Sequence, residues 1–147
     1  MHILYICAVT LQHISFLKQP PEDVKHRYEK FMNQHFEKSM TVQKCDRTIN
    51  FKDIYQLDSR GNKLCKDTNS FIYSSSASDI INICDNAGKR YKNTDFRISL
   101  QPFPIITCSN GSGRYPKCQY RGHNSNRYIV IGCAEGWPVH YEKGVLP

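Results

Sequence analysis

Residues 65–71 are Cys-Lys-Asp-Thr-Asn-Ser-Phe, and the cysteine that opens this stretch belongs to a widely spaced set. Of the seven cysteines, the last six lie no closer together than ten positions. Structural zinc sites usually take ligands about two to four residues apart, so this spacing disfavours zinc. It indicates three disulfides and an oxidising compartment, although spacing alone leaves fifteen pairings open. The six cysteines are Cys45, Cys65, Cys84, Cys108, Cys118 and Cys133.

Length and charge narrow the class of protein further. The chain has 147 residues, of which 39% are hydrophobic, and this predicts one compact domain. Twenty Lys and Arg against thirteen Asp and Glu leave a net charge of +7. Such a charge favours anionic partners, which include nucleic acid, heparin-like glycans and acidic membrane surfaces. No apolar run approaches the ~18 residues of a membrane-spanning helix.

The first eighteen residues are expected to be an atypical or remnant signal sequence or an N-terminal extension, with the domain at 19–147. Residues 3–9 have the length of a signal-peptide apolar core, but no Lys or Arg precedes them. An unstructured extension is the alternative. Asn110-Gly111-Ser112 matches the glycosylation acceptor pattern, which is usable only in a secretory route; an ordinary Asn-Gly turn is its alternative. The expected location is extracellular.

Apolar periodicity predicts helices first and strands later. Pro21 and the acidic residues after it favour a helix start, and Val24, Tyr28, Phe31 and His35 then share one helical face. The segments that follow are rich in β-forming residues and predict antiparallel strands. Helices followed by antiparallel strands are the order expected of an α+β domain. Further helices are expected at 48–56 and 78–84, strands at 96–100, 105–108, 115–121 and 127–131, and turns at 110–113 and 122–126.

Three motifs in order around the six cysteines resemble the pancreatic ribonuclease (ribonuclease A) superfamily. Residues 65–71 look like its signature C-K-x-x-N-T-F, with Ser70 in place of threonine. Residues 28–36 resemble its first helix, and residues 137–142 resemble its C-terminal P-V-H strand; residues 118–121 also fit. Within that superfamily the chain is most similar to angiogenins and to small basic ribonucleases of non-mammalian vertebrates.

The resemblance implies a ribonuclease A-like fold over residues 19–147, with three helices packed on a bent antiparallel sheet. It implies three disulfides, which pair Cys45 with Cys108, Cys65 with Cys118, and Cys84 with Cys133. This chain holds extra residues between Cys45 and Cys65, so the length of the second helix and of the loop after it stays open.

The resemblance also implies a metal-independent and cofactor-independent endoribonuclease. His35 would be the base that takes the 2′-hydroxyl proton, and His140 the acid that protonates the departing 5′-oxygen, which predicts a bell-shaped pH profile. Lys66 would stabilise the charge on the phosphoryl oxygens. The expected product is a 2′,3′-cyclic phosphate after a pyrimidine. The predicted substrate-binding residues are Gln34, Asn69, Ser70, Tyr141, Lys30 and Arg121.

A second hypothesis is a cationic effector, angiogenic or bactericidal, in which RNA cleavage is weak or dispensable. A third, weaker one is a heparin-binding growth factor. The expected partners are RNA, an anionic bacterial surface or heparin-like glycans, and a ribonuclease inhibitor by analogy, with the protein a monomer. Whether Lys143 obstructs the base pocket or adds a phosphate contact stays open from the sequence.

Overall fold

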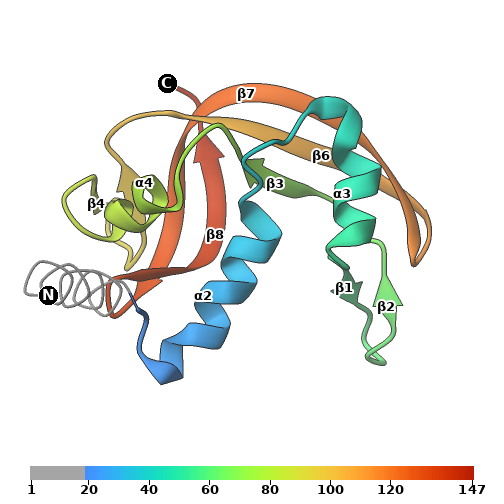
Figure 1. Ribbon diagram of the computed structural model, residues 1–147, viewed down its shortest axis with the longest axis horizontal. Coiled ribbons are helices and arrows are strands. Elements are labelled where there is room, and N and C mark those ends of the chain that lie inside the picture. Colours follow the sequence, from blue (N-terminus) through green and yellow to red (C-terminus); the bar gives the residue numbers. More distant parts are fainter. Residues whose placement is uncertain (1–18) are drawn as a thin grey trace, which may run out of the picture.

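Two long antiparallel strands run through the protein, whose computed structural model describes residues 19–147. β6 (Phe103–Arg114) and β7 (Lys117–Ala134) lie side by side across the molecule (Figure 1). They belong to a six-stranded antiparallel sheet of order β3-β6-β7-β5-β4, in which β8 also pairs with β7. The other strands of this sheet are β3 (Asn69–Ile72), β4 (Gly88–Arg90), β5 (Arg97–Ser99) and β8 (Trp137–Val145).

The first helix, α2 (Glu22–His35), confirms the helix predicted after Pro21. Glu22 and Asp23 occupy its first turn, where carboxylates complement the partial positive charge of the helix end. Val24, Phe31 and His35 are buried on its inner face. The segment expected as a signal sequence or extension, residues 1–18, lies outside the described residues.

Two shorter helices follow. α3 (Cys45–Phe51), preceded by the 3₁₀ turn η1 (Val42–Lys44), replaces the helix predicted at 48–56, so those bounds were wrong. The predicted apolar residue Ile54 is buried, but it follows the helix in a turn in which its N–H donates to the carbonyl of Ile49. α4 (Ala77–Ile81) and the 3₁₀ turn η2 (Asn82–Cys84) confirm the third helix. Within the described part of the chain, no helix is long and apolar enough to cross a membrane.

Between α3 and Cys65 the chain forms a small hairpin. β1 (Gln56–Leu57) pairs with β2 (Lys63–Leu64), and both strands lie at the surface. The loop between them is held by the Asp58 carboxylate, which accepts hydrogen bonds from the backbone N–H groups of Arg60 and Asn62 at 2.8 Å each.

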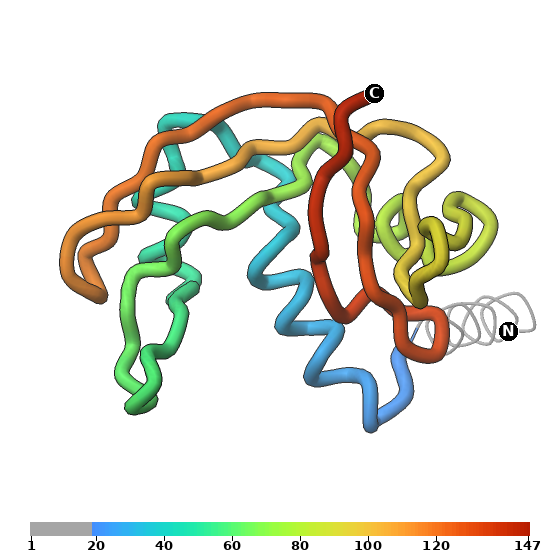
Figure 2. Tube along the Cα trace, turned by 180° about the vertical axis from the view of Figure 1, so that it is seen from behind, coloured from blue at the N-terminus to red at the C-terminus, as the bar shows by residue number. Residues whose placement is uncertain are grey.

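Around Ile105 and Ile106, different groups of residues bury the two faces of the sheet. Ile105 and Ile106 are neighbours in β6 and point to opposite faces, as strand alternation requires. Ile105 lies in a cluster that α2 and α4 close through Phe31 and Ile80. Ile106 lies in a second cluster, which α3 closes through Ile49. Figure 2 shows the backbone from behind, with α2 lying below the long strands.

The turns predicted at 110–113 and 122–126 were wrong, because both segments lie within strands. Asn110 and Gly111 form a bulge in β6, where the register with β7 shifts between Ser109 and Ser112. Gly122 lies inside the continuous strand β7. Glycine is needed at position 122 because the backbone of Val42 approaches closely: a Cβ on residue 122 would lie 2.4 Å from the Val42 carbonyl oxygen. The actual turn between β6 and β7 is at Tyr115-Pro116.

Three disulfides cross-link these layers, and they join the same cysteine pairs that the resemblance implies. They close separations of 63, 53 and 49 residues, and loops of this size stabilise a fold by about 4 kcal/mol each on the chain-entropy model. The predicted α+β architecture, with three α-helices on an antiparallel sheet and three disulfides, is confirmed. The pairs are Cys45–Cys108, Cys65–Cys118 and Cys84–Cys133.

Candidate active site

A cleft of about 630 Å³ lies where α2, β3 and β8 meet. His35, Lys66 and His140 all line it, although they are far apart in the chain. Of the predicted substrate-binding residues, the cleft is also lined by Gln34, Asn69, Ser70 and Tyr141.

His35 is the buried side of this site. Its side chain leaves the last turn of α2, and its Nδ1 lies 2.9 Å from the carbonyl oxygen of Ser70. Because a carbonyl only accepts, Nδ1 carries the proton in this bond, and Nε2 is left with a free lone pair. Burial lowers the pKa of His35 from 6.5 to about 4, and the nearby charges of Lys66 and His140 act in the same direction. The ring is therefore neutral at pH 7 and can accept a proton.

Lys66 is held through Asn69. The Lys66 ammonium donates to Asn69 Oδ1 at 2.8 Å, and Asn69 Nδ2 donates to the carbonyl of Gln34 at 2.8 Å. Burial, followed by the charge of Lys30, lowers the pKa of Lys66. Lys66 forms no ion pair with any carboxylate of residues 19–147, so its charge is available to an anionic ligand.

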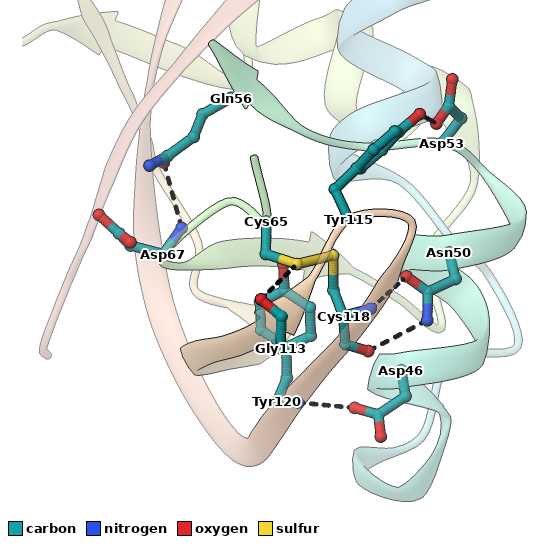
Figure 3. Close-up of a disulfide and its surroundings, with 10 residues drawn as sticks. All are labelled: Asp46, Asn50, Asp53, Gln56, Cys65, Asp67, Gly113, Tyr115, Cys118 and Tyr120. Carbon is teal, nitrogen blue, oxygen red and sulfur yellow. Dashed lines mark hydrogen bonds between the residues drawn. A yellow bond between two sulfur atoms is a disulfide. The ribbon is translucent and has the colours of Figure 1, made fainter. Parts of the chain in front are cut away.

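The backbone on either side of Lys66 is held by contacts of its neighbours Cys65 and Asp67 (Figure 3). The adjacent Cys65 is bonded to Cys118, and the Asn50 side chain of α3 both donates to the Cys118 carbonyl and accepts from the Cys118 N–H, at 3.0 and 3.1 Å. On the following residue, the Asp67 carbonyl accepts from the Gly111 N–H at 3.0 Å. The β6 bulge therefore helps to hold the segment that presents Lys66.

His140 is the exposed side of the site. Its Nε2 lies 2.9 Å from Glu142 Oε1, and its ring stacks on Phe96 with centroids 5.7 Å apart. Neither partner was predicted from the sequence. Glu142 could have been found, because residues two apart in a strand share a face. Phe96 comes from a distant part of the chain and carries no such signal.

Ser70 pairs across strands with a residue that the sequence did not indicate. Ser70 and Thr107 are direct partners in the β3–β6 register, and their hydroxyl oxygens are 3.0 Å apart. Both line the cleft, as does Arg127 of β7. The Tyr141 ring stacks on His35 with centroids 4.9 Å apart, and both residues line the cleft.

Two predicted substrate contacts lie outside this cleft. Lys30 lines a neighbouring cleft of about 340 Å³ on the other side of His35 and His140. Arg121 is exposed on β7 and lines neither cleft. Lys143 does line the main cleft, but its ammonium lies 5.3 Å from the ring centroid of Tyr91. Residues 19–147 contain no cluster of three or more His, Cys, Asp or Glu side chains suited to a metal ion.

The fold and the cleft together define a disulfide-linked α+β protein with two histidines and a lysine around one ligand site. The chain belongs to the pancreatic ribonuclease family, whose model matches residues 26–142. It is 39% identical to "Ribonuclease-like 3" of Danio rerio over 146 residues. The matched region covers 98% of this chain and 93% of that protein. It is 36% identical to "Angiogenin-4" of Mus musculus over 121 residues, 82% of this chain and 80% of that protein.

Solved structures agree with this assignment. The X-ray structure of zebrafish RNase5 superposes with a TM-score of 0.76 at 46% identity and covers 86% of this chain and 100% of that chain. The protein is therefore an angiogenin-like ribonuclease of the ribonuclease A superfamily, and RNA is its substrate.

The buried His35 predicts how stability depends on pH. Its pKa is lower in the folded protein, so the unfolded chain binds more protons between about pH 4 and 6.5, and stability is lost as the pH falls through that range. Replacing His35 with Gln should remove about 2 kcal/mol of the difference in unfolding free energy between pH 7 and pH 4.5. Urea unfolding of both proteins at both pH values measures this, and an equal pH effect in the two would contradict it.

Proposed function

We propose that the protein cleaves single-stranded RNA on the 3′ side of pyrimidines and forms a 2′,3′-cyclic phosphate. The observation that carries this proposal is that His35, Lys66 and His140 surround one cleft. Breaking the phosphodiester through its own 2′-hydroxyl requires one group that accepts a proton and another that supplies one to the leaving oxygen. No water or metal ion enters this first step.

His35 is the base in this proposal. Its Nε2 takes the proton of the 2′-hydroxyl as that oxygen attacks phosphorus, and the Ser70 carbonyl holds the ring by Nδ1. A buried imidazole is a ready acceptor because it is neutral before the reaction. Burial makes the protonated ring of His35 unfavourable, and the hydrogen bond to the Ser70 carbonyl partly offsets this cost because it favours the charged ring.

His140 is the acid. An imidazolium has two N–H donors, of which Nε2 faces Glu142 at 2.9 Å. The other, Nδ1, is available to the 5′-oxygen as the P–O bond breaks. Stacking on Phe96 restrains the ring between these two partners. In the later hydrolysis of the cyclic phosphate the two histidines exchange roles.

Lys66 and Gln34 act on the phosphoryl oxygens, where negative charge accumulates in the transition state. The ammonium is positioned by Asn69 and carries no carboxylate partner among the described residues. The Gln34 side chain also lines the cleft, and its backbone carbonyl anchors Asn69. Asn69 is therefore a positioning residue.

Ser70 and Thr107 form the base pocket in this proposal. Each hydroxyl can donate or accept, so the pair can match either pyrimidine by reversing its hydrogen bond. Serine lacks the methyl group of the family's usual threonine, so base packing is weaker. The Lys143 ammonium is engaged with Tyr91, and this contact favours a phosphate-side role over obstruction of the pocket.

We further propose that the protein is secreted and acts as a monomer, with residues 1–18 as a signal or N-terminal extension and 19–147 as the mature domain. Three disulfides and the family support an extracellular location. A ribonuclease inhibitor is a proposed partner by the same analogy.

A second candidate function is supported by the net charge of +7 and by relatives named angiogenin. It is a cationic effector, angiogenic or bactericidal, that binds heparin-like glycans or anionic bacterial surfaces. Enzyme and effector can coexist in one chain.

The enzyme proposal predicts the effect of removing Lys66. Lys66→Ala should lower kcat/KM on a fluorogenic pyrimidine dinucleotide by about 10²–10³-fold, because the transition state loses its cation. The assay is run in EDTA across pH, with thermal unfolding as a check on the fold. Lys89→Ala, which removes the same charge from exposed β4, is the control. Equal activities for the two variants would contradict the role of Lys66.

The effector candidate predicts a different result for His140→Ala. This variant leaves every Lys and Arg in place, so an effector that acts through their charge should retain bacterial killing or vessel growth, while RNA cleavage falls by about 10²–10⁴-fold. Parallel loss of both activities would show instead that the biological output requires cleavage.

A further inference from the structure

The hairpin of β1 and β2 ends close to the lysine of the cleft. β2 finishes at Leu64, Cys65 follows in its disulfide with Cys118, and Lys66 is the next residue. Because each residue has only two soft backbone dihedral angles, so short a connection carries a movement of the hairpin to Lys66. The contacts that fix the hairpin therefore bear on the position of this lysine.

Four side chains fasten the hairpin to the turn between β6 and β7, and they are called the tyrosine clamp: Asp53, Tyr55, Lys63 and Tyr115. The Lys63 ammonium lies 4.4 Å from the ring centroid of Tyr55 and 5.6 Å from that of Tyr115. The two rings meet edge to face with centroids 5.8 Å apart. Asp53 accepts a hydrogen bond from the Tyr115 hydroxyl and lies 3.7 Å from the Lys63 ammonium. A cation this close to two aromatic rings is attracted to both, so the clamp restrains the hairpin.

The other face of the hairpin contacts the segment that presents Lys66. Leu57 pairs directly with Lys63, and Gln56 is the neighbour of Leu57 in β1. Strand alternation therefore places Gln56 on the face opposite to Lys63. On that face, Gln56 Oε1 accepts a hydrogen bond from the Asp67 N–H at 3.2 Å (Figure 3). The hairpin thus joins the tyrosine clamp to the residue that follows Lys66.

The peptide group after Lys66 is held from two directions. Gln56 accepts from the Asp67 N–H, while the Asp67 carbonyl accepts from the Gly111 N–H at 3.0 Å. The Lys66 side chain is long and flexible, so its ammonium reaches Asn69 in one geometry only if its backbone is fixed. Gln56 is the part of this support that comes from the hairpin.

We propose that the β1–β2 hairpin braces Lys66 and that Gln56 is a positioning residue for the reaction. This proposal rests on the proposed function, in which Lys66 stabilises the charge on the phosphoryl oxygens. Gln56 lines neither cleft, so it acts through the backbone of Asp67 and not on the substrate. A cation that is held in place before the reaction stabilises the transition state without reorganisation. The loss of Gln56 therefore affects kcat more than KM.

The first test removes the acceptor and keeps the size of the side chain. Gln56→Leu should lower kcat on a pyrimidine dinucleotide by about three- to tenfold, the range of one hydrogen bond, with little change in KM. Gln56→Glu keeps an oxygen for the Asp67 N–H and should recover most of this loss. Gln119→Leu makes the same change at an exposed position of β7 and should match the wild type. A kcat of Gln56→Leu equal to that of the wild type would overturn the proposal.

A double-mutant cycle separates positioning from a general effect on the fold. In Lys66→Ala no ammonium is left to position, so adding Gln56→Leu should lower kcat/KM no further. A merely structural role of Gln56 would cost the same factor in both backgrounds, and that result would overturn the proposal.

Hydrogen exchange tests the brace without turnover. The backbone amide of Asp67 should exchange about three- to tenfold faster in Gln56→Leu than in the wild type, because it loses its acceptor, and at the wild-type rate in Gln119→Leu. If the wild type cleaves no RNA but the amide shows this change, the proposed reaction fails and the brace stands. An unchanged exchange rate in Gln56→Leu overturns the brace, whatever the cleavage result.

Discussion

Strand β3 holds the last turn of helix α2, and the geometry of the cleft depends on this contact. The Ser70 carbonyl fixes His35, and the Asn69 side chain joins the Gln34 carbonyl to the Lys66 ammonium. Asn69 is only 2% exposed, so its hydrogen-bonding groups have been removed from water and are satisfied by these two partners. His35 is buried as well, and its own burial lowers its pKa and keeps the ring neutral at pH 7. His140, in contrast, is exposed and restrained by one carboxylate and one aromatic ring, so the site combines a rigid base with an accessible acid.

The sequence was sufficient for the architecture and insufficient for the course of the long strands. Cysteine spacing, helical periodicity and three motifs predicted the α+β class and the three disulfides. The Asn110-Gly111 pair, a common hairpin signal, was misleading. A Cβ at Gly111 would lie 2.2 Å from the Lys66 carbonyl oxygen, so this glycine serves a contact with a distant segment. Local propensity carries no information on such contacts. The same limit applies to α3, which begins at Cys45 and not at the predicted residue 48.

The site divides in the same way. Residues within the three motifs were predicted, and the structure brings His35, Lys66 and His140 to one cleft. Thr107 and Arg127 were missed because each reaches the site through strand register, which one sequence does not display. Phe96, just before β5, was missed because its contact with His140 joins distant segments of the chain. Arg121 was predicted to bind substrate, but it is exposed on β7 and lines neither cleft. Charge predicts the kind of ligand, whereas pairing between strands decides which charges can touch it.

The division of labour between the two histidines is tested most directly by changing the leaving group. A uridine 3′-phosphodiester with a 4-nitrophenyl group loses a stable anion and needs no acid, whereas a dinucleotide must protonate its 5′-oxygen. The account predicts that His140→Ala loses about 10²–10⁴-fold in kcat/KM on the dinucleotide and far less on the aryl ester, while His35→Ala loses heavily on both. Equal losses for His140→Ala on the two substrates would contradict it.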